Sequence, residues 1–139
     1  MAIPMRREPA TFEEAMTTLG TNIVDAFNRG DVNACMEFYT DDATLLLPDR
    51  PPIKGREAIE AVLTEYAAAG TKLVSVDPVE VGSNADLGYY AGTCQLDMPA
   101  DDGSTVKQTG KFVSVFRLQA DGSWKAVIDS LIKDTTAGS

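Results

Sequence analysis

The chain of 139 residues contains no histidine, and this absence excludes the largest number of functions. Without histidine there is no Ser-His-Asp triad, no Cys-His nucleophile pair and no histidine-containing zinc site. Any acid–base chemistry therefore falls to Asp, Glu, Tyr, Lys or Cys side chains. We expect neither a metal nor a cofactor in this protein.

Cysteine and basic residues are also scarce. The two cysteines, Cys35 and Cys94, form no C-x-x-C motif and are far apart, so two buried free thiols are expected rather than a disulfide. The 12 Lys and Arg are outnumbered by 21 Asp and Glu, which gives a net charge of -9. A charge of this sign repels nucleic acids and anionic membranes.

Long apolar runs are missing as well. No stretch reaches the length of a membrane span, and the two arginines near the N-terminus are not followed by the apolar core of a secretion signal. The sequence is therefore interpreted as that of a cytoplasmic protein. Its length and its 44% hydrophobic content suit one globular domain, predicted over residues 11–134, with flexible ends at 1–10 and 135–139.

The first half of the chain reads mainly as helices. Thr11 to Glu14 has the form of a capping box, and apolar residues then recur at helical spacing as far as Gly30. Asp31 caps a predicted short second helix that extends to Tyr39 and is ended by Thr-Asp-Asp at 40–42. A buried strand is predicted at 43–48, followed by a loop, and a third helix runs from about Arg56 to Gly70.

The second half reads as four strands, at about 72–81, 87–98, 105–119 and 123–133, separated by short turns. Short connections favour an antiparallel meander. The predicted order is ααβαββββ, an α+β domain, with Pro78 indicating an edge strand or a bulge. The late strands carry apolar residues on both faces, so we predict a homodimer through the outer face of the sheet.

The stretches "FNRGDVNACMEFYTDDATLLLP", "IKGREAIEAVL" and "GKFVSVFRLQADGSWKAVIDSLIKD", in this order and spacing, resemble the nuclear transport factor 2-like superfamily, especially its small bacterial SnoaL-like members. The resemblance runs from about Glu13 to Asp134. It implies a cystatin-like fold, in which a curved antiparallel sheet wraps around the long first helix. The resulting cone would hold an apolar pocket suited to a small molecule.

The superfamily includes ketosteroid isomerases, cyclases, dehydratases, association domains and transport adaptors, so the resemblance does not fix an activity. The three catalytic residues of ketosteroid isomerases align here with Ile23, Leu47 and Ser114. Since none of the three is retained, we expect no ketosteroid isomerase activity.

The same alignment turns one set of side chains toward the pocket. Asp129 and Tyr90 are the catalytic candidates. The predicted substrate-binding residues are Ser114, Gln108, Phe112, Phe116, Leu47, Ile23, Cys94 and Leu131.

Each polar candidate has an alternative interpretation. Asp129 would gain a raised pKa in an apolar pocket and serve as acid or base, or it is an ordinary strand carboxylate paired with Lys111, Lys125 or Lys133.

Tyr90 donates a hydrogen bond to Asp129 or to a ligand, or it is a core tyrosine. Ser114 and Gln108 orient a ligand or satisfy each other. The thiol of Cys94 lacks an activating neighbour and is expected to be inert.

Two charged segments have simpler readings. Asp41 and Asp42 are attributed to helix exit rather than to a metal site. Asp49 and Arg50 form a salt bridge at the pocket rim or gate the pocket.

The sequence thus predicts a protein that binds a small apolar molecule, with cofactor-free isomerase, cyclase or dehydratase chemistry at Asp129. The alternative is a non-catalytic ligand-binding or dimeric association domain.

Overall fold

The computed structural model describes residues 11–134, which form an α+β fold as predicted. The helices are α1 (Phe12–Asn28), α2 (Val32–Cys35), the 3-10 turn η1 (Met36–Phe38) and α3 (Arg56–Ala69). The strands are β1 (Tyr39–Leu46), β2 (Ile53–Lys54), β3 (Lys72–Asn84), β4 (Leu87–Pro99), β5 (Thr105–Leu118) and β6 (Trp124–Lys133). The predicted flexible ends, 1–10 and 135–139, lie outside the described residues. None of the described helices is both long and apolar enough to cross a membrane.

The six strands form one sheet in the order β2-β1-β6-β5-β4-β3. The four late strands pair antiparallel with one another, as predicted for a meander. β1 lies parallel to β6, and the two-residue β2 pairs with β1 where the sequence predicted only loop. The element order therefore contains one more strand than the predicted ααβαββββ.

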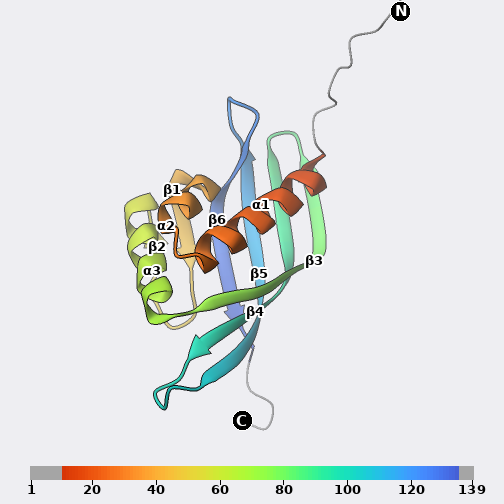
Figure 1. The fold of residues 1–139 in the computed structure, drawn as a ribbon. Coiled ribbons are helices and arrows are strands. Elements are labelled where there is room, and N and C mark those ends of the chain that lie inside the picture. The colour runs from red at the N-terminus through yellow and green to blue at the C-terminus, as the bar shows by residue number, and fades with distance from the viewer. Residues whose placement is uncertain (1–10, 135–139) are drawn as a thin grey trace, which may run out of the picture.

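The long first helix lies across one face of the curved sheet (Figure 1). Its N-terminus is capped by Thr11, whose hydroxyl oxygen accepts a hydrogen bond of 3.1 Å from the Glu14 N–H. Met16, Ala26 and Phe27 are its buried residues. They join a core that also takes in Ile59 of α3 and Phe116 of β5, so helices and sheet share one apolar interior.

The predicted second helix is wrong at its end. α2 stops at Cys35, η1 follows, and Tyr39 begins β1. Asp41 and Asp42 are strand residues and not a helix exit. The pairing of β1 with β6 is irregular between Tyr39 and Thr44, and both carboxylates are exposed to solvent.

β3 is an edge strand of the sheet, and it has a register shift between Pro78 and Glu80. Proline lacks the N–H that a central strand needs, so both features agree with the prediction made from Pro78. Gly92 of β4 pairs with Pro78, and a Cβ at Gly92 would collide with the backbone carbonyl oxygen of Asp77. Glycine at this position lets the two strands approach closely where the sheet bends.

Candidate functional site

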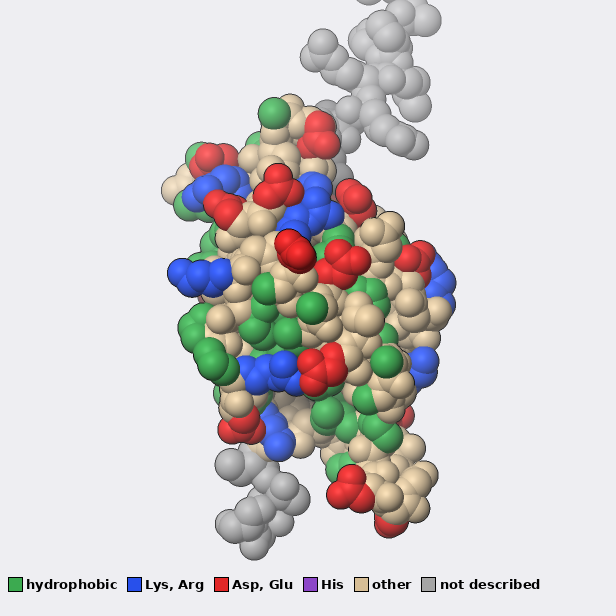
Figure 2. All heavy atoms as spheres, turned by 90° about the vertical axis from the view of Figure 1, so that its left-hand side faces the viewer, with side chains coloured by type: hydrophobic (Ala, Val, Ile, Leu, Met, Phe, Trp, Pro, Cys, Tyr) green, Lys and Arg blue, Asp and Glu red, His purple; other side chains and the backbone are tan. Residues whose placement is uncertain are grey.

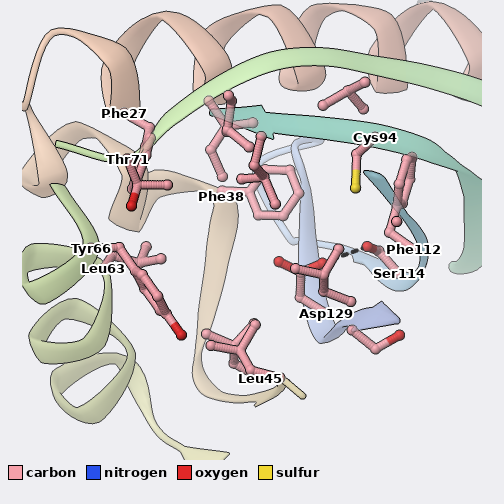
Figure 3. Close-up of a pocket in the computed structure, with 18 of the residues that line it drawn as sticks. Phe27, Phe38, Leu45, Leu63, Tyr66, Thr71, Cys94, Phe112, Ser114 and Asp129 are labelled. Atoms are coloured by element: carbon pink, nitrogen blue, oxygen red, sulfur yellow. Dashed lines mark hydrogen bonds between the residues drawn. The ribbon is translucent and has the colours of Figure 1, made fainter. Parts of the chain in front are cut away.

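A cavity of about 430 Å³ lies between α1, α3 and the face of the sheet that α1 covers (Figure 3). All ten predicted site residues line it: Ile23, Leu47, Tyr90, Cys94, Gln108, Phe112, Ser114, Phe116, Asp129 and Leu131. Most other lining residues are apolar, including Leu45, Leu63 and Leu73. A pocket of this size and character suits a small ligand with few polar groups.

Asp129 points into this cavity from β6 and accepts two hydrogen bonds. The Ser114 hydroxyl donates to Oδ1 at 2.6 Å, and the Tyr39 phenol donates to Oδ2 at 2.8 Å. The bond from Ser114 is drawn in Figure 3. Each carboxylate oxygen therefore has one hydroxyl donor, which fixes the orientation of the group.

The sheet brings these three side chains together. Ser114 of β5 stands directly opposite Asp129 of β6, and Leu45 of β1 pairs with Asp129 from the other side. Tyr39 reaches the same carboxylate because η1 delivers the chain to the start of β1, beside Ala126 of β6. The group thus combines residues from three neighbouring strands.

Burial shifts the acidity of both Asp129 and Tyr39. Loss of hydration raises the pKa of Asp129 above 3.8, although the hydrogen bonds from Ser114, Tyr39 and the Ser130 backbone partly oppose this. Burial, reinforced by the adjacent Asp129 charge, raises the pKa of the Tyr39 phenol well above its ordinary value. Asp129 keeps some accessible surface because it lines the cavity. The phenol stays protonated and remains a donor, while the carboxyl becomes a weaker acid.

No ion pair among residues 11–134 includes Asp129. Lys111 instead pairs with Asp134, and Lys125 lies 3.7 Å from Glu37. The alternative interpretation of Asp129 as a lysine-paired strand carboxylate therefore receives no support from the described residues.

Tyr90 and Gln108 differ in part from expectation. The Tyr90 ring stacks on Phe112 at 5.1 Å between centroids, and within the described residues no hydrogen bond joins it to Asp129. Its contact with a ligand stays a prediction. The Gln108 amide donates to the backbone oxygens of Thr109 and Asp134, while Ser114 donates to Asp129, so these two side chains do not satisfy each other.

Tyr39 is the functional candidate that the sequence analysis missed, because it was placed on the second helix. The available signal was the spacing of Tyr39, Ala43 and Leu45, which share the buried side of β1. The polar residues at 40–42 hid this pattern.

Both cysteines line the cavity, and both are free and buried. Burial raises the pKa of the Cys35 thiol to about 11, and burial with the Asp134 and Asp129 charges raises that of Cys94. Thiols of such high pKa are poor nucleophiles near neutral pH. The expectation of inert cysteines thus has a physical basis in the structure.

Charged residues occur where the cavity reaches the surface. Asp49 and Arg50 line it, but Arg50 pairs with Glu65 of α3 at 2.9 Å rather than with Asp49. The Arg50 guanidinium also lies 5.2 Å from the centre of the Tyr66 ring. Figure 2 shows this side of the molecule, where apolar side chains gather in the middle of the face among charged ones.

The described residues contain no cluster of three or more His, Cys, Asp or Glu side chains arranged to hold a metal. Asp41 forms a salt bridge of 3.2 Å with Arg56, and Asp42 accepts a hydrogen bond from the Thr40 hydroxyl. These contacts account for both carboxylates without a ligand.

Comparison with known families agrees with this architecture. A model of the SnoaL-like domain matches residues 21–127, which is most of the chain. The chain belongs to the SnoaL-like family. A search of curated proteins gave no match for this SnoaL-like protein.

Solved structures with the same fold have varied descriptions. A ketosteroid isomerase-like protein from Erwinia carotovora atroseptica is 23% identical, with a TM-score of 0.77 over 95% of this chain and 100% of its own. A candidate dehydratase of the NTF2-like family from Streptomyces avermitilis is 21% identical, with a TM-score of 0.77 over 93% and 100%. A candidate calcium/calmodulin-dependent protein kinase II association domain from Xanthomonas campestris is 18% identical, with a TM-score of 0.73 over 99% and 95%.

At these identities the likeness establishes the fold alone. An NTF2-like protein from Novosphingobium aromaticivorans, 20% identical with a TM-score of 0.75 over 91% of this chain and 84% of its own, is described as having a cystatin-like fold, as the sequence predicted here. The family and the fold are therefore settled, and the activity has to be argued from the cavity.

Proposed function

We propose that this SnoaL-like protein binds a small, largely apolar molecule in the cavity and that Asp129 transfers a proton on it. The main support for this proposal is the position of the Asp129 carboxyl at the wall of an apolar cavity. The Tyr39 and Ser114 hydroxyls hold it there with hydrogen bonds of 2.8 and 2.6 Å. A carboxyl buried among apolar side chains is unfavourable for folding unless it is paired or used.

The proposed chemistry needs no cofactor. Asp129 as the carboxylate takes a proton from a carbon or hydroxyl of the ligand, and its raised pKa makes it a stronger base than an exposed aspartate. The carboxylic acid so formed then returns the proton to another ligand atom. Isomerisation, cyclisation and dehydration all proceed by such a pair of transfers. The candidate dehydratase with the same fold supports this class of reaction.

In this account Tyr39 and Ser114 position Asp129. Both hydroxyls donate to the carboxylate, and Ser114 at 2.6 Å is close enough to accept a hydrogen bond from it once it carries the proton. Tyr90, Phe112 and Gln108 are proposed to contact the ligand body, as the sequence analysis predicted.

The binding step is tested with the neutral fluorescent probe N-phenyl-1-naphthylamine. We expect its emission to rise on binding to the wild type. Leu63→Trp places a larger side chain in the cavity wall and should abolish the rise, while Val79→Trp, on the exposed side of β3, should not. Equal binding by both variants would mean that the probe sits outside the cavity.

The proton-transfer step is tested with Asp129→Asn, which keeps the size of the side chain and removes the titrating proton. Once a turned-over compound is found by screening apolar ketones and alcohols, Asp129→Asn should abolish turnover while still binding the probe. Full turnover by this variant would remove Asp129 from the mechanism.

A second candidate function, association through the outer sheet face, rests on exposed apolar residues. Val113, Ile128 and Ile132 keep 42, 40 and 54% of their surface accessible, and they lie on the face of β5 and β6 opposite to Asp129. The candidate association domain from Xanthomonas campestris has the same fold. We propose a homodimer through this face, as the sequence predicted. The cytoplasmic location stays a prediction.

Sedimentation velocity tests this second candidate. The wild type should sediment as a dimer, and Val113→Glu with Ile128→Glu should sediment as a monomer with an unchanged circular dichroism spectrum. A monomeric wild type at high micromolar concentration would exclude the association function.

A further inference from the structure

Two cationic side chains, Arg50 and Lys133, line the cavity, and Lys133 is exposed to solvent while Arg50 is half-buried. Arg50 follows β1 in the chain, and Lys133 is the last residue of β6. Because β1 and β6 are adjacent and parallel, with Leu46 paired to Ser130, their carboxyl ends leave the sheet at the same edge. The fold therefore brings both cations to one end of the cavity.

Arg50 is held in place by its neighbours. Its terminal nitrogens donate to the two carboxylate oxygens of Glu65, at 2.9 and 3.5 Å, and its guanidinium lies over the Tyr66 ring. A guanidinium has five N–H donors, so this contact with Glu65 leaves further donors for a ligand. An arginine fixed in this way loses little conformational freedom when an anion binds.

Lys133 has no such neighbour, since no salt bridge among residues 11–134 includes it. The only other charged residues that line the cavity are Asp129, whose pKa is raised, and Asp49, which like Lys133 is exposed to solvent. The cavity lining thus includes two cations, although the chain has only 12 Lys and Arg and a net charge of -9.

Resting on the proposed pocket function, we infer that the ligand is a small organic acid. Its carboxylate lies at the opening against Arg50 and Lys133, and its apolar body fills the cavity toward Asp129. The acid group anchors the molecule and is not the group on which Asp129 acts. This deepens the proposed function by naming the chemical class of the ligand.

Displacement of N-phenyl-1-naphthylamine by decanoate and by decan-1-ol tests the inference. The two competitors share a ten-carbon chain and differ in charge, and the alcohol is the more apolar molecule. A purely apolar pocket prefers the alcohol. We expect the wild type to prefer decanoate, and about 0.5 M salt to reduce that preference by screening.

The variant Arg50→Gln with Lys133→Gln should weaken decanoate binding by about fivefold or more, and decanol binding by much less, so that the preference is lost. Arg29→Gln with Lys54→Gln is the matched control, because it removes the same charge from residues outside the cavity lining. The control should keep the wild-type preference.

The outcomes separate the inference from the function on which it rests. If the probe does not bind the wild type, both the pocket function and the organic-acid ligand fail. If the probe binds but decanol displaces it as well as decanoate does, the pocket stands and the organic-acid ligand is wrong. An equal loss of decanoate binding in both double variants would likewise overturn the assignment to Arg50 and Lys133.

Discussion

The Tyr39 phenol donates a hydrogen bond of 2.8 Å to Oδ2 of Asp129, a residue 90 positions away in the chain. Tyr39 is 2% exposed, so its phenol has no access to bulk water as an alternative partner. Tyr89 makes the chemically similar bond to Glu80, at 3.1 Å, on the surface of the sheet. The two pairs offer a matched comparison between a buried and an exposed tyrosine–carboxylate contact.

We expect Tyr39→Phe to lower the free energy of unfolding near neutral pH by about 1.5–3 kcal/mol, the range for a hydrogen bond to a charged group. Phenylalanine keeps the ring, so the packing against Phe38 is retained. Tyr89→Phe should show no measurable change, because water satisfies the exposed Glu80. Urea denaturation of both variants measures this difference, and equal stability of the two would show that the buried bond has no special role.

Asp129 should also make stability depend on pH. Its pKa in the folded protein lies above the ordinary 3.8, so over the interval between these two values the folded state holds a proton that the unfolded state has lost. The stability that Asp129 contributes is fully present below about pH 3.8 and is lost as the pH rises through its folded-state pKa. Asp129→Asn should remove this loss, which urea denaturation of both proteins across this pH range measures.

Asp134 provides a control of opposite sign. Lys111 and Thr109 hold the pKa of Asp134 below 3.8, so its contribution is present above that pH and is lost as the pH falls. The stability difference between wild type and Asp134→Asn should therefore grow with rising pH, while that for Asp129→Asn shrinks. Parallel slopes for the two variants would contradict the burial of Asp129.

Alanine substitutions at two glycines test the close approach of β3 and β4, with Gly92 at the contact and Gly20 away from it. In Gly92→Ala the new methyl group meets the Asp77 carbonyl and the Phe112 ring, and we expect a loss of about 1–3 kcal/mol in the free energy of unfolding. Gly20 lies inside α1, and a Cβ added there would have no neighbouring atom within 4 Å, so Gly20→Ala should add about 0.5–1 kcal/mol through helix propensity. Thermal denaturation gives both signs, and a stable Gly92→Ala protein would argue against the close approach of β3 and β4.

The reactivity of the two thiols measures how freely solvent reaches the cavity wall. Because the pKa values of Cys35 and Cys94 are raised, native protein should react slowly with iodoacetamide near neutral pH and rapidly in urea. A ligand in the cavity should slow the native reaction further, since both residues line the wall. Mass spectrometry follows this reaction, and fast labelling of the native protein would show that solvent reaches the cavity wall freely.

The sequence could predict much of this arrangement, although not from residue patterns alone. Alternation along 124–134 shows that Asp129 shares a face with Leu131, but a period of two does not say which face is buried. The family resemblance made that choice, and the pairing of Ser114 with Asp129 agrees with it. The functional roles of these residues stay predictions.

The sequence analysis did not predict the strand position of Tyr39 or the existence of β2. Thr40, Asp41 and Asp42 are residue types typical of turns, yet they lie in β1, where Asp41 and Asp42 are exposed and the pairing with β6 is irregular. The two residues of β2 show no periodicity, and their strand depends on hydrogen bonding to β1. The partner of Arg50 was also unpredictable, because Glu65 is fifteen positions away on a helix whose docking the sequence does not specify.

The pKa of Asp129 is the most direct test of the central claim that this carboxyl is buried in a cavity and poised for proton transfer. Carboxyl carbon nuclear magnetic resonance measures it, with the signal assigned by its absence in Asp129→Asn. We expect a pKa above 3.8 that rises further in Tyr39→Phe, which removes a donor to the carboxylate. A pKa at or below 3.8 would identify a solvated or ion-paired strand residue and contradict the proposed chemistry.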